Sequence, residues 1–113
     1  MFISVTYLEL KSITKIFRFI KYNFRVVKQM KNTPGLLKQE TRGRSLYRYY
    51  TLTAWNSKQS MLNFRNSEAH LEAMRITKSV ATKADAINFE SDDLPGWKLA
   101  FQMMDAHLAA RRK

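Results

Sequence analysis

The side chain best suited to acid–base chemistry in this sequence belongs to His70. An imidazole titrates near neutral pH, so it can act as a general base that takes a proton from a phenolic substrate. His70 follows Ser67, a residue type that caps helices, and the apolar spacing predicts that it lies on the inner face of that helix. The alternative is a partly buried structural histidine bonded to a backbone carbonyl or a tyrosine. Both roles stay open, because the sequence shows no partner for His70.

Three further side chains could form the walls of a flat aromatic pocket beside such a base: Trp55, Phe64 and Met74. Each has an ordinary structural alternative, because aromatic residues also fill cores at strand ends and methionine is an adaptable filler. The second tryptophan, Trp97, is expected to pack a terminal helix onto the body of the domain. The second histidine, His107, is expected to be exposed near the end of the chain.

The sequence lacks the motifs of the common enzyme sites. It has only three glycines and no glycine-rich phosphate loop, no Ser-His-Asp grouping, and no His/carboxylate spacing for zinc or non-heme iron. We therefore expect no metal site. If the chain is an enzyme, it needs few groups: an apolar pocket, one base and a substrate that itself activates oxygen.

The elements that would position these residues follow from hydrophobic periodicity and turn signals. The predicted elements, in chain order, are a strand Phe2–Leu10, a helix opened by Ser12, a weak strand Leu36–Arg42, a strand Ser45–Trp55, a short helix capped by Asn56-Ser57, a helix Glu68–Lys83, a strand Asp85–Ser91 and a helix Trp97–Arg111. This order, βαββαβ with an extra C-terminal helix, predicts one α+β, ferredoxin-like domain over residues 1–113 with a four-stranded antiparallel sheet.

Two helices are expected to turn apolar stripes toward the sheet. The first stripe comprises Ile13, Ile16, Phe17, Ile20, Phe24, Val27 and Met30, and the second comprises His70, Ala73, Met74, Thr77, Val80, Ala81 and Ala84. Strand Ser45–Trp55 carries apolar or aromatic residues on both faces, so we expect a central strand covered on both sides. The two helices leave one aromatic face of the sheet open, and hiding that face predicts a homodimer.

Composition restricts the partners and the compartment. The 113 residues include no cysteine, which excludes disulfides and thiolate metal sites and makes the cytoplasm the simplest location. The net charge is +11, and Met1–Lys38 holds eight Lys or Arg against one acid, Glu9. Such a surface can attract nucleic acid, anionic lipid or an anionic small molecule, or can simply keep copies of the protein apart. No nucleic-acid motif accompanies the charge, and Lys and Arg interrupt every apolar run that could span a bilayer.

The segment Thr51–Val80 resembles the core signature of the antibiotic biosynthesis monooxygenase superfamily, the dimeric α/β barrels. In that group a strand ends in Trp, a Ser or charged residue starts a helix, an aromatic follows, and a small-residue/His region opens the next helix. The matching residues are Leu52-Thr53-Ala54-Trp55, Ser57-Lys58-Gln59, Phe64 and Ser67-Glu68-Ala69-His70. The superfamily includes cofactor-free oxygenases acting on quinols and polyketides, heme-degrading monooxygenases and many proteins with no known activity.

The heme-degrading branch is similar around Leu52–Gln59. That branch has an Asn in the first strand, a second Trp that helps to distort the heme and a later His that ligates the iron. Carried over without a gap, the distorting position falls on Phe64 and the ligand position on Met74 rather than His70. No Asn stands between Met1 and Lys11. All three positions differ, so we expect no heme and no other cofactor.

Three functions follow from these residues. The first is a homodimeric, cofactor-independent monooxygenase-like protein for a small aromatic, quinol or polyketide-type substrate, with His70 as base and Trp55, Phe64 and Met74 as walls. The second is a small-molecule-binding or interaction module on the same fold without turnover. The third is a peripheral protein held at an anionic surface by the basic helix Ser12–Lys31.

Overall fold

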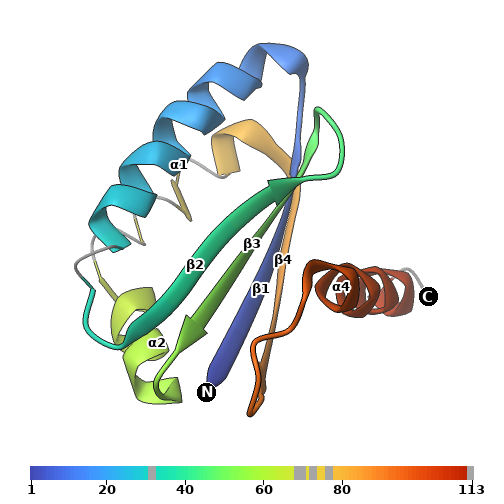
Figure 1. Ribbon diagram of the computed structural model, residues 1–113. Coiled ribbons are helices and arrows are strands. Elements are labelled where there is room, and N and C mark those ends of the chain that lie inside the picture. Colours follow the sequence, from blue (N-terminus) through green and yellow to red (C-terminus); the bar gives the residue numbers. More distant parts are fainter. Residues whose placement is uncertain (31–32, 68–70, 72–73, 76–77, 112–113) are drawn as a thin grey trace.

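The computed structural model describes residues 1–30, 33–67, 71, 74–75 and 78–111. Its elements are β1 (Phe2–Leu10), the 3-10 turn η1 (Ile13–Lys15), α1 (Ile16–Met30), β2 (Leu36–Gly43), β3 (Arg48–Trp55), α2 (Lys58–Arg65), β4 (Ala81–Glu90) and α4 (Trp97–Arg111). Residues 71, 74–75 and 78–80 are helical as well. Figure 1 shows α1 and α2 on one side of the sheet and α4 on the other. None of the described helices is both long enough and apolar enough to cross a lipid bilayer.

The four strands form one antiparallel sheet in the order β2-β3-β1-β4. β1 lies inside the sheet, where it pairs with β3 from Phe2↔Trp55 to Glu9↔Arg48 and with β4 on its other side. β3 is therefore a central strand, as its two apolar faces predict. The predicted α+β, ferredoxin-like fold with a C-terminal helix is confirmed.

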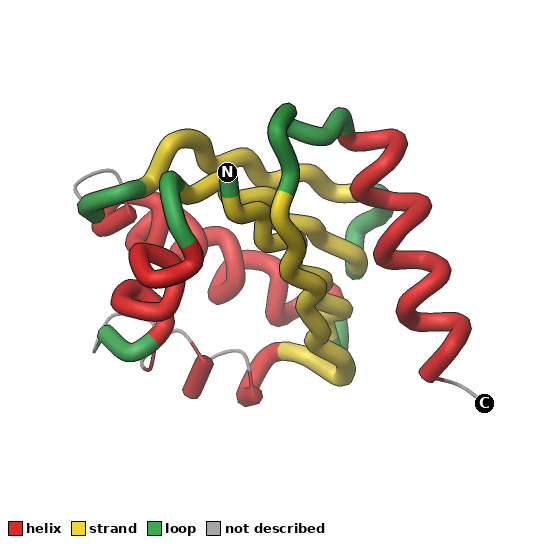
Figure 2. Tube along the Cα trace, turned by 90° about the horizontal axis from the view of Figure 1, so that it is seen from below, coloured by secondary structure: helices red, strands yellow, loops and turns green. Residues whose placement is uncertain are grey.

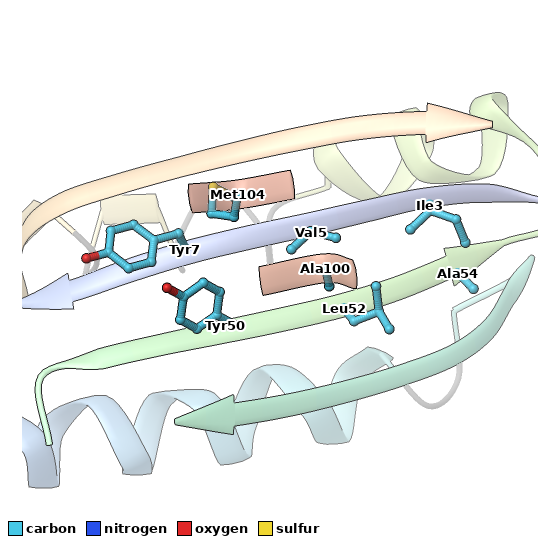
Figure 3. Packing of buried hydrophobic residues seen from close by; sticks show 8 residues of the cluster. All are labelled: Ile3, Val5, Tyr7, Tyr50, Leu52, Ala54, Ala100 and Met104. Atoms are coloured by element: carbon cyan, nitrogen blue, oxygen red, sulfur yellow. The ribbon is translucent and has the colours of Figure 1, made fainter. Parts of the chain in front are cut away.

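The face of the sheet that was expected to be open is covered by α4, so that prediction is wrong. Ala100 and Met104, one helical turn apart on α4, are buried against the sheet (Figure 3). The side chains beneath them come from β1 and β3 and comprise Ile3, Val5, Tyr7, Tyr50, Leu52 and Ala54. Helix Trp97–Arg111 was predicted, but periodicity alone did not say which surface it would cover. Because burial of apolar surface is favourable, the C-terminal helix of the same chain covers this apolar sheet face.

Polar contacts at two points hold α4 in place. Arg44, in the β2–β3 turn, donates from Nη1 to both carboxylate oxygens of Asp105 at 3.0 Å and to the Tyr50 hydroxyl at 3.2 Å. Its guanidinium carbon also lies 4.6 Å from the centre of the Phe101 ring. At the other point, Arg111 donates to Asp85 of β4 at 2.6 Å.

The pKa of Asp85 is lowered by its partners on this side of the sheet. Burial by itself raises the pKa of Asp85, but hydrogen bonds from the Ala86 backbone N–H and from Arg111, with His107 beside it, lower the pKa below its ordinary value. His107 Nε2 is buried and lies 3.2 Å from Asp85 Oδ2, so the expectation that His107 is simply exposed is wrong. The tail helix brings it onto β4, which its position near the chain end did not indicate.

The first long helix turns a different face outward than its periodicity predicts. Phe17, Ile20 and Phe24 are 82%, 53% and 74% exposed, although all three belong to the stripe expected to face the sheet. The cause lies in the composition of α1, IFRFIKYNFRVVKQM, which has aromatic or branched residues on more than one side. The spacing of apolar residues along α1 is therefore compatible with more than one buried face, and tertiary contacts determine which one is buried.

Two element boundaries also differ from the predictions. β3 begins at Arg48 rather than Ser45, because residues 44–47 form the turn in which the Arg44 N–H bonds the Arg48 carbonyl. β4 begins at Ala81 rather than Asp85. Ala81–Ala84 has good helix formers, yet it pairs with the end of β1 through Leu8↔Ala84 and Glu9↔Lys83. The ladder to a central strand overrides local helix propensity here.

Candidate functional site

Four hydroxyl side chains lie together in the middle of the sheet, on the face toward α1 and α2. The register pairs Ser4 with Thr53 and Thr6 with Thr51 across β1 and β3. Successive side chains of a strand point to opposite faces, so these four share the face of Phe2 and Trp55. We call Ser4, Thr6, Thr51 and Thr53 the hydroxyl patch.

An aromatic cluster borders the patch at the end of β3. Trp55 is 1% exposed and packs with Phe2, Met61 and Phe64. The Trp55 and Phe64 rings have centroids 5.5 Å apart at an angle of 33°. Phe64 reaches this place because Ser57 caps α2, its side chain accepting from the Ser60 N–H at 3.2 Å.

Hydrogen bonds join the aromatic cluster to the hydroxyl patch. Trp55 Nε1 donates to Thr53 Oγ1 at 3.0 Å, and Thr53 Oγ1 in turn donates to the Ser4 carbonyl at 3.4 Å. The side-chain amide of Asn88 is best oriented with its oxygen and nitrogen exchanged, since both atoms then find hydrogen-bond partners. In that orientation the nitrogen donates to Ser4 Oγ at 2.8 Å and the oxygen accepts from Arg65 at 3.3 Å. These hydrogen bonds connect the hydroxyl patch to Asn88 of β4 and Arg65 of α2.

Solvent reaches this face at the centre of the sheet. Ser4 and Thr53 are buried, but Thr6, on the inner strand β1, is exposed, and Thr51 opposite it is half-buried. Beyond them, Leu8, Tyr49 and Ile16 pack around the buried pair Leu10 and Val80. The hydroxyl patch thus lies between two apolar clusters and is accessible to solvent at Thr6 and in part at Thr51.

The structure brings two of the predicted site residues together. Trp55 and Phe64 are in contact, as predicted walls of one site would be. Met74 is 48% exposed, so its predicted inward position is wrong. The candidate base, His70, lies outside the described residues.

The sequence reading missed the hydroxyl patch, Asn88 and Arg65. The Ser and Thr residues of β1 and β3 fit strand propensity, which does not by itself mark a site. The alternation within FISVTYLEL and RYYTLTAW places two hydroxyl residues at the alternate positions next to the terminal aromatic of each strand, Ser4 and Thr6 after Phe2 and Thr53 and Thr51 before Trp55. What the sequence could not give is the register that sets Ser4 against Thr53.

This arrangement suits a flat ligand with oxygen substituents. The buried rings of Trp55 and Phe64 lie at one end of the patch, and its hydroxyl groups can both donate and accept hydrogen bonds. Arg65 adds a cation that would favour a phenolate or enolate form. Among the described residues, no group of three or more His, Cys, Asp or Glu side chains is placed to hold a metal ion.

Comparison with known sequences gives no relative: no family model matches the chain, and no curated protein matches it. Solved structures do match. A Deinococcus radiodurans protein and a Nitrosomonas europaea protein, both assigned as antibiotic biosynthesis monooxygenases, superpose with TM-scores of 0.78 and 0.76 at 13% and 11% identity. The matches cover 85% and 82% of this chain, and 97% and 100% of those chains.

A variant of SnoaB from Streptomyces nogalater, described as a cofactor-independent oxygenase, superposes with a TM-score of 0.71 at 13% identity. That match covers 84% of this chain and 97% of the SnoaB chain. Matches over 82–85% of the chain extend well beyond the segment Thr51–Val80. This chain therefore has the fold of the antibiotic biosynthesis monooxygenases.

Proposed function

We propose that this protein is a cofactor-independent, monooxygenase-like enzyme for a small aromatic, quinol or polyketide-type substrate. One observation carries the proposal: the hydroxyl patch is open to solvent at Thr6 and is bordered by the buried, tilted rings of Trp55 and Phe64. A ring system could lie over the patch, beside this aromatic cluster, while its oxygen substituents bond to the hydroxyls. The description of SnoaB, a protein with the same fold, as a cofactor-independent oxygenase supports this reading.

In the proposed reaction the substrate is the only reductant, and it supplies all four electrons that dioxygen takes up. A base removes a proton from a CH₂ group flanked by aromatic rings, and the carbanion reduces dioxygen. The peroxide formed at that carbon then loses water. One oxygen atom of dioxygen becomes the new carbonyl and the other leaves in water, so the sum is CH₂ plus O₂ giving C=O plus H₂O. His70 is the candidate base, and Arg65 would stabilise negative charge on the substrate oxygens.

A binding module without turnover is the second candidate. The hydroxyl patch contains no general base, which favours this candidate. Hydroxyl and amide groups orient a ligand, but they do not take up protons at neutral pH. In that case the same patch would bind the ligand and leave it unchanged.

Fluorescence and oxygen uptake together separate the two candidates. The chain has two tryptophans, so Trp97→Phe leaves Trp55 as the only one, and a bound anthrone should quench its emission. Quenching accompanied by dioxygen uptake supports the enzyme, and quenching alone supports the binding module. No change in Trp55 emission with anthrone or a naphthoquinol would contradict both.

A further inference from the structure

The outer face of α1 combines large apolar side chains with positive charge. Phe17, Ile20 and Phe24 recur at intervals of three and four residues, so they share one side of the helix, and all three are mostly exposed. Lys21 and Lys28 follow Phe17 by four and eleven residues, within about 40° of it around the helix. We call these five residues the outer α1 face.

The charge carried by this helix is of one sign. Arg18 and Arg25 stand beside it and are exposed, like Lys21 and Lys28. The sequence contains no acid between Glu9 and Glu40, so no carboxylate of this segment offsets the charge. Figures 1 and 2 show α1 as a long helix on the opposite side of the sheet from α4.

We propose that the outer α1 face docks on an anionic lipid bilayer. An interfacial helix lies flat with its apolar side chains in the boundary between headgroups and acyl chains, while flanking Lys and Arg contact anionic headgroups. Phe17, Phe24 and Ile20 supply the apolar part, and lysine can extend its charged end toward the phosphate level. This surface is separate from the hydroxyl patch and does not depend on the proposed reaction.

Two other occupants fit the same face less well. A second copy of the chain would bring two α1 helices together, each with at least four cations and no acid, and like charges repel. Single-stranded nucleic acid is bound in basic grooves with aromatic platforms for stacked bases. A convex helix whose apolar row includes the aliphatic Ile20 suits a flat lipid interface better.

The test is co-sedimentation of the full chain with phosphatidylcholine vesicles that contain or lack phosphatidylserine. The protein should bind only the vesicles with phosphatidylserine. Binding should weaken sharply between about 0.1 M and 1 M salt, because the screening length falls from about 10 Å to about 3 Å. Lys21→Gln/Lys28→Gln should weaken binding roughly twenty-five-fold, on the basis of about five-fold for each basic residue at such a surface.

A second variant tests the apolar part. Phe17→Ser/Phe24→Ser should weaken vesicle binding by about ten-fold or more without loss of folding, because both side chains are already exposed. The matched control is Lys98→Gln/Leu99→Ser on α4, where both residues are also exposed, and it should bind like the wild type. Circular dichroism melts verify that each variant folds.

Three results would overturn the proposal. The first is no binding to vesicles with phosphatidylserine. The second is binding that Phe17→Ser/Phe24→Ser leaves unchanged, which would indicate attraction to any polyanion and would be accompanied by equal binding to single-stranded RNA. The third is a wild type that self-associates through this face, seen as a fall in mass when Phe17 and Phe24 are replaced.

Discussion

Thr53 is the residue on which the orientation of Trp55 depends. Its hydroxyl accepts from the indole N–H and donates to the Ser4 carbonyl, and both side chains are buried. A buried indole N–H without an acceptor is costly, so this pair fixes the ring that borders the hydroxyl patch. Trp55 is accordingly a core residue at the border of the hydroxyl patch, and its role as a wall of a substrate site stays a prediction.

Replacing Thr53 by Val removes the acceptor and keeps the shape. We expect a loss of about 1–3 kcal/mol in the free energy of unfolding, because the buried Trp55 N–H is left without a partner. Urea denaturation followed by Trp fluorescence measures it. The control is Thr41→Val on the exposed edge strand β2, expected to change stability by no more than about 0.5 kcal/mol. Equal stability of the two variants would show that the bond does not hold Trp55.

At the scale of elements, Gly35 joins the entry of β2 to the exit of β3. Its φ is +87°, a conformation that other residues adopt at a cost, and its carbonyl accepts from the Asn56 N–H at 2.8 Å. A Cβ at this position would overlap the side chains of Ser60 and Asn56. The close approach sets the start of α2, and hence Phe64, against Trp55.

Gly35→Ala should therefore destabilise the protein by about 1–3 kcal/mol from backbone strain alone, with the overlap at Ser60 adding to it. Gly96→Ala is the matched control, because a Cβ there meets no atom within 4 Å. Thermal melts of the two variants should differ clearly. If Gly35→Ala melts at the same temperature as the wild type, the close approach of Gly35 to Ser60 and Asn56 does not constrain this turn.

The attachment of α4 to β4 through Asp85 should depend on pH. The folded pKa of Asp85 is lowered, so its contribution to stability is present above the unfolded pKa of about 3.9 and is lost as pH falls through the folded value. Asp85→Asn should be less stable than the wild type at neutral pH, and the difference should vanish in acid. Asp92→Asn, an exposed control, should show no such trend. A constant difference at every pH would contradict this role for Asp85.

The helices and strands were largely predictable from the sequence. Which face of each helix packs against the sheet was not predictable. Pro34-Gly35 ended the first helix and Ser57 began α2, because turn and cap chemistry is local. The outward side of α1 and the cover over the second sheet face depend on contacts far apart in sequence. The outward Phe17 and the inward Met104 have the same hydropathic character, so no pattern could separate them.

For the whole molecule, the homodimer stays a prediction, and its original argument no longer holds. The aromatic sheet face that required a partner is covered by α4. The resemblance to dimeric α/β barrels still predicts a dimer. Its interface would be formed by another surface, or by this sheet face if α4 were displaced from it. Sedimentation equilibrium over a range of dilutions measures it. A monomer at micromolar concentration whose mass does not change on dilution would contradict the dimer.

The central claim is oxygenation without a cofactor, and dioxygen uptake by chelator-treated protein with anthrone tests it most directly. The wild type should consume one dioxygen for each anthrone converted, faster than spontaneous oxidation. His70→Asn, shown by its melt to be folded, should be slower by about a hundred-fold to ten-thousand-fold, as expected for loss of a positioned base. Uptake no faster than the spontaneous rate, or uptake that begins only when a metal or heme is added, would contradict the account.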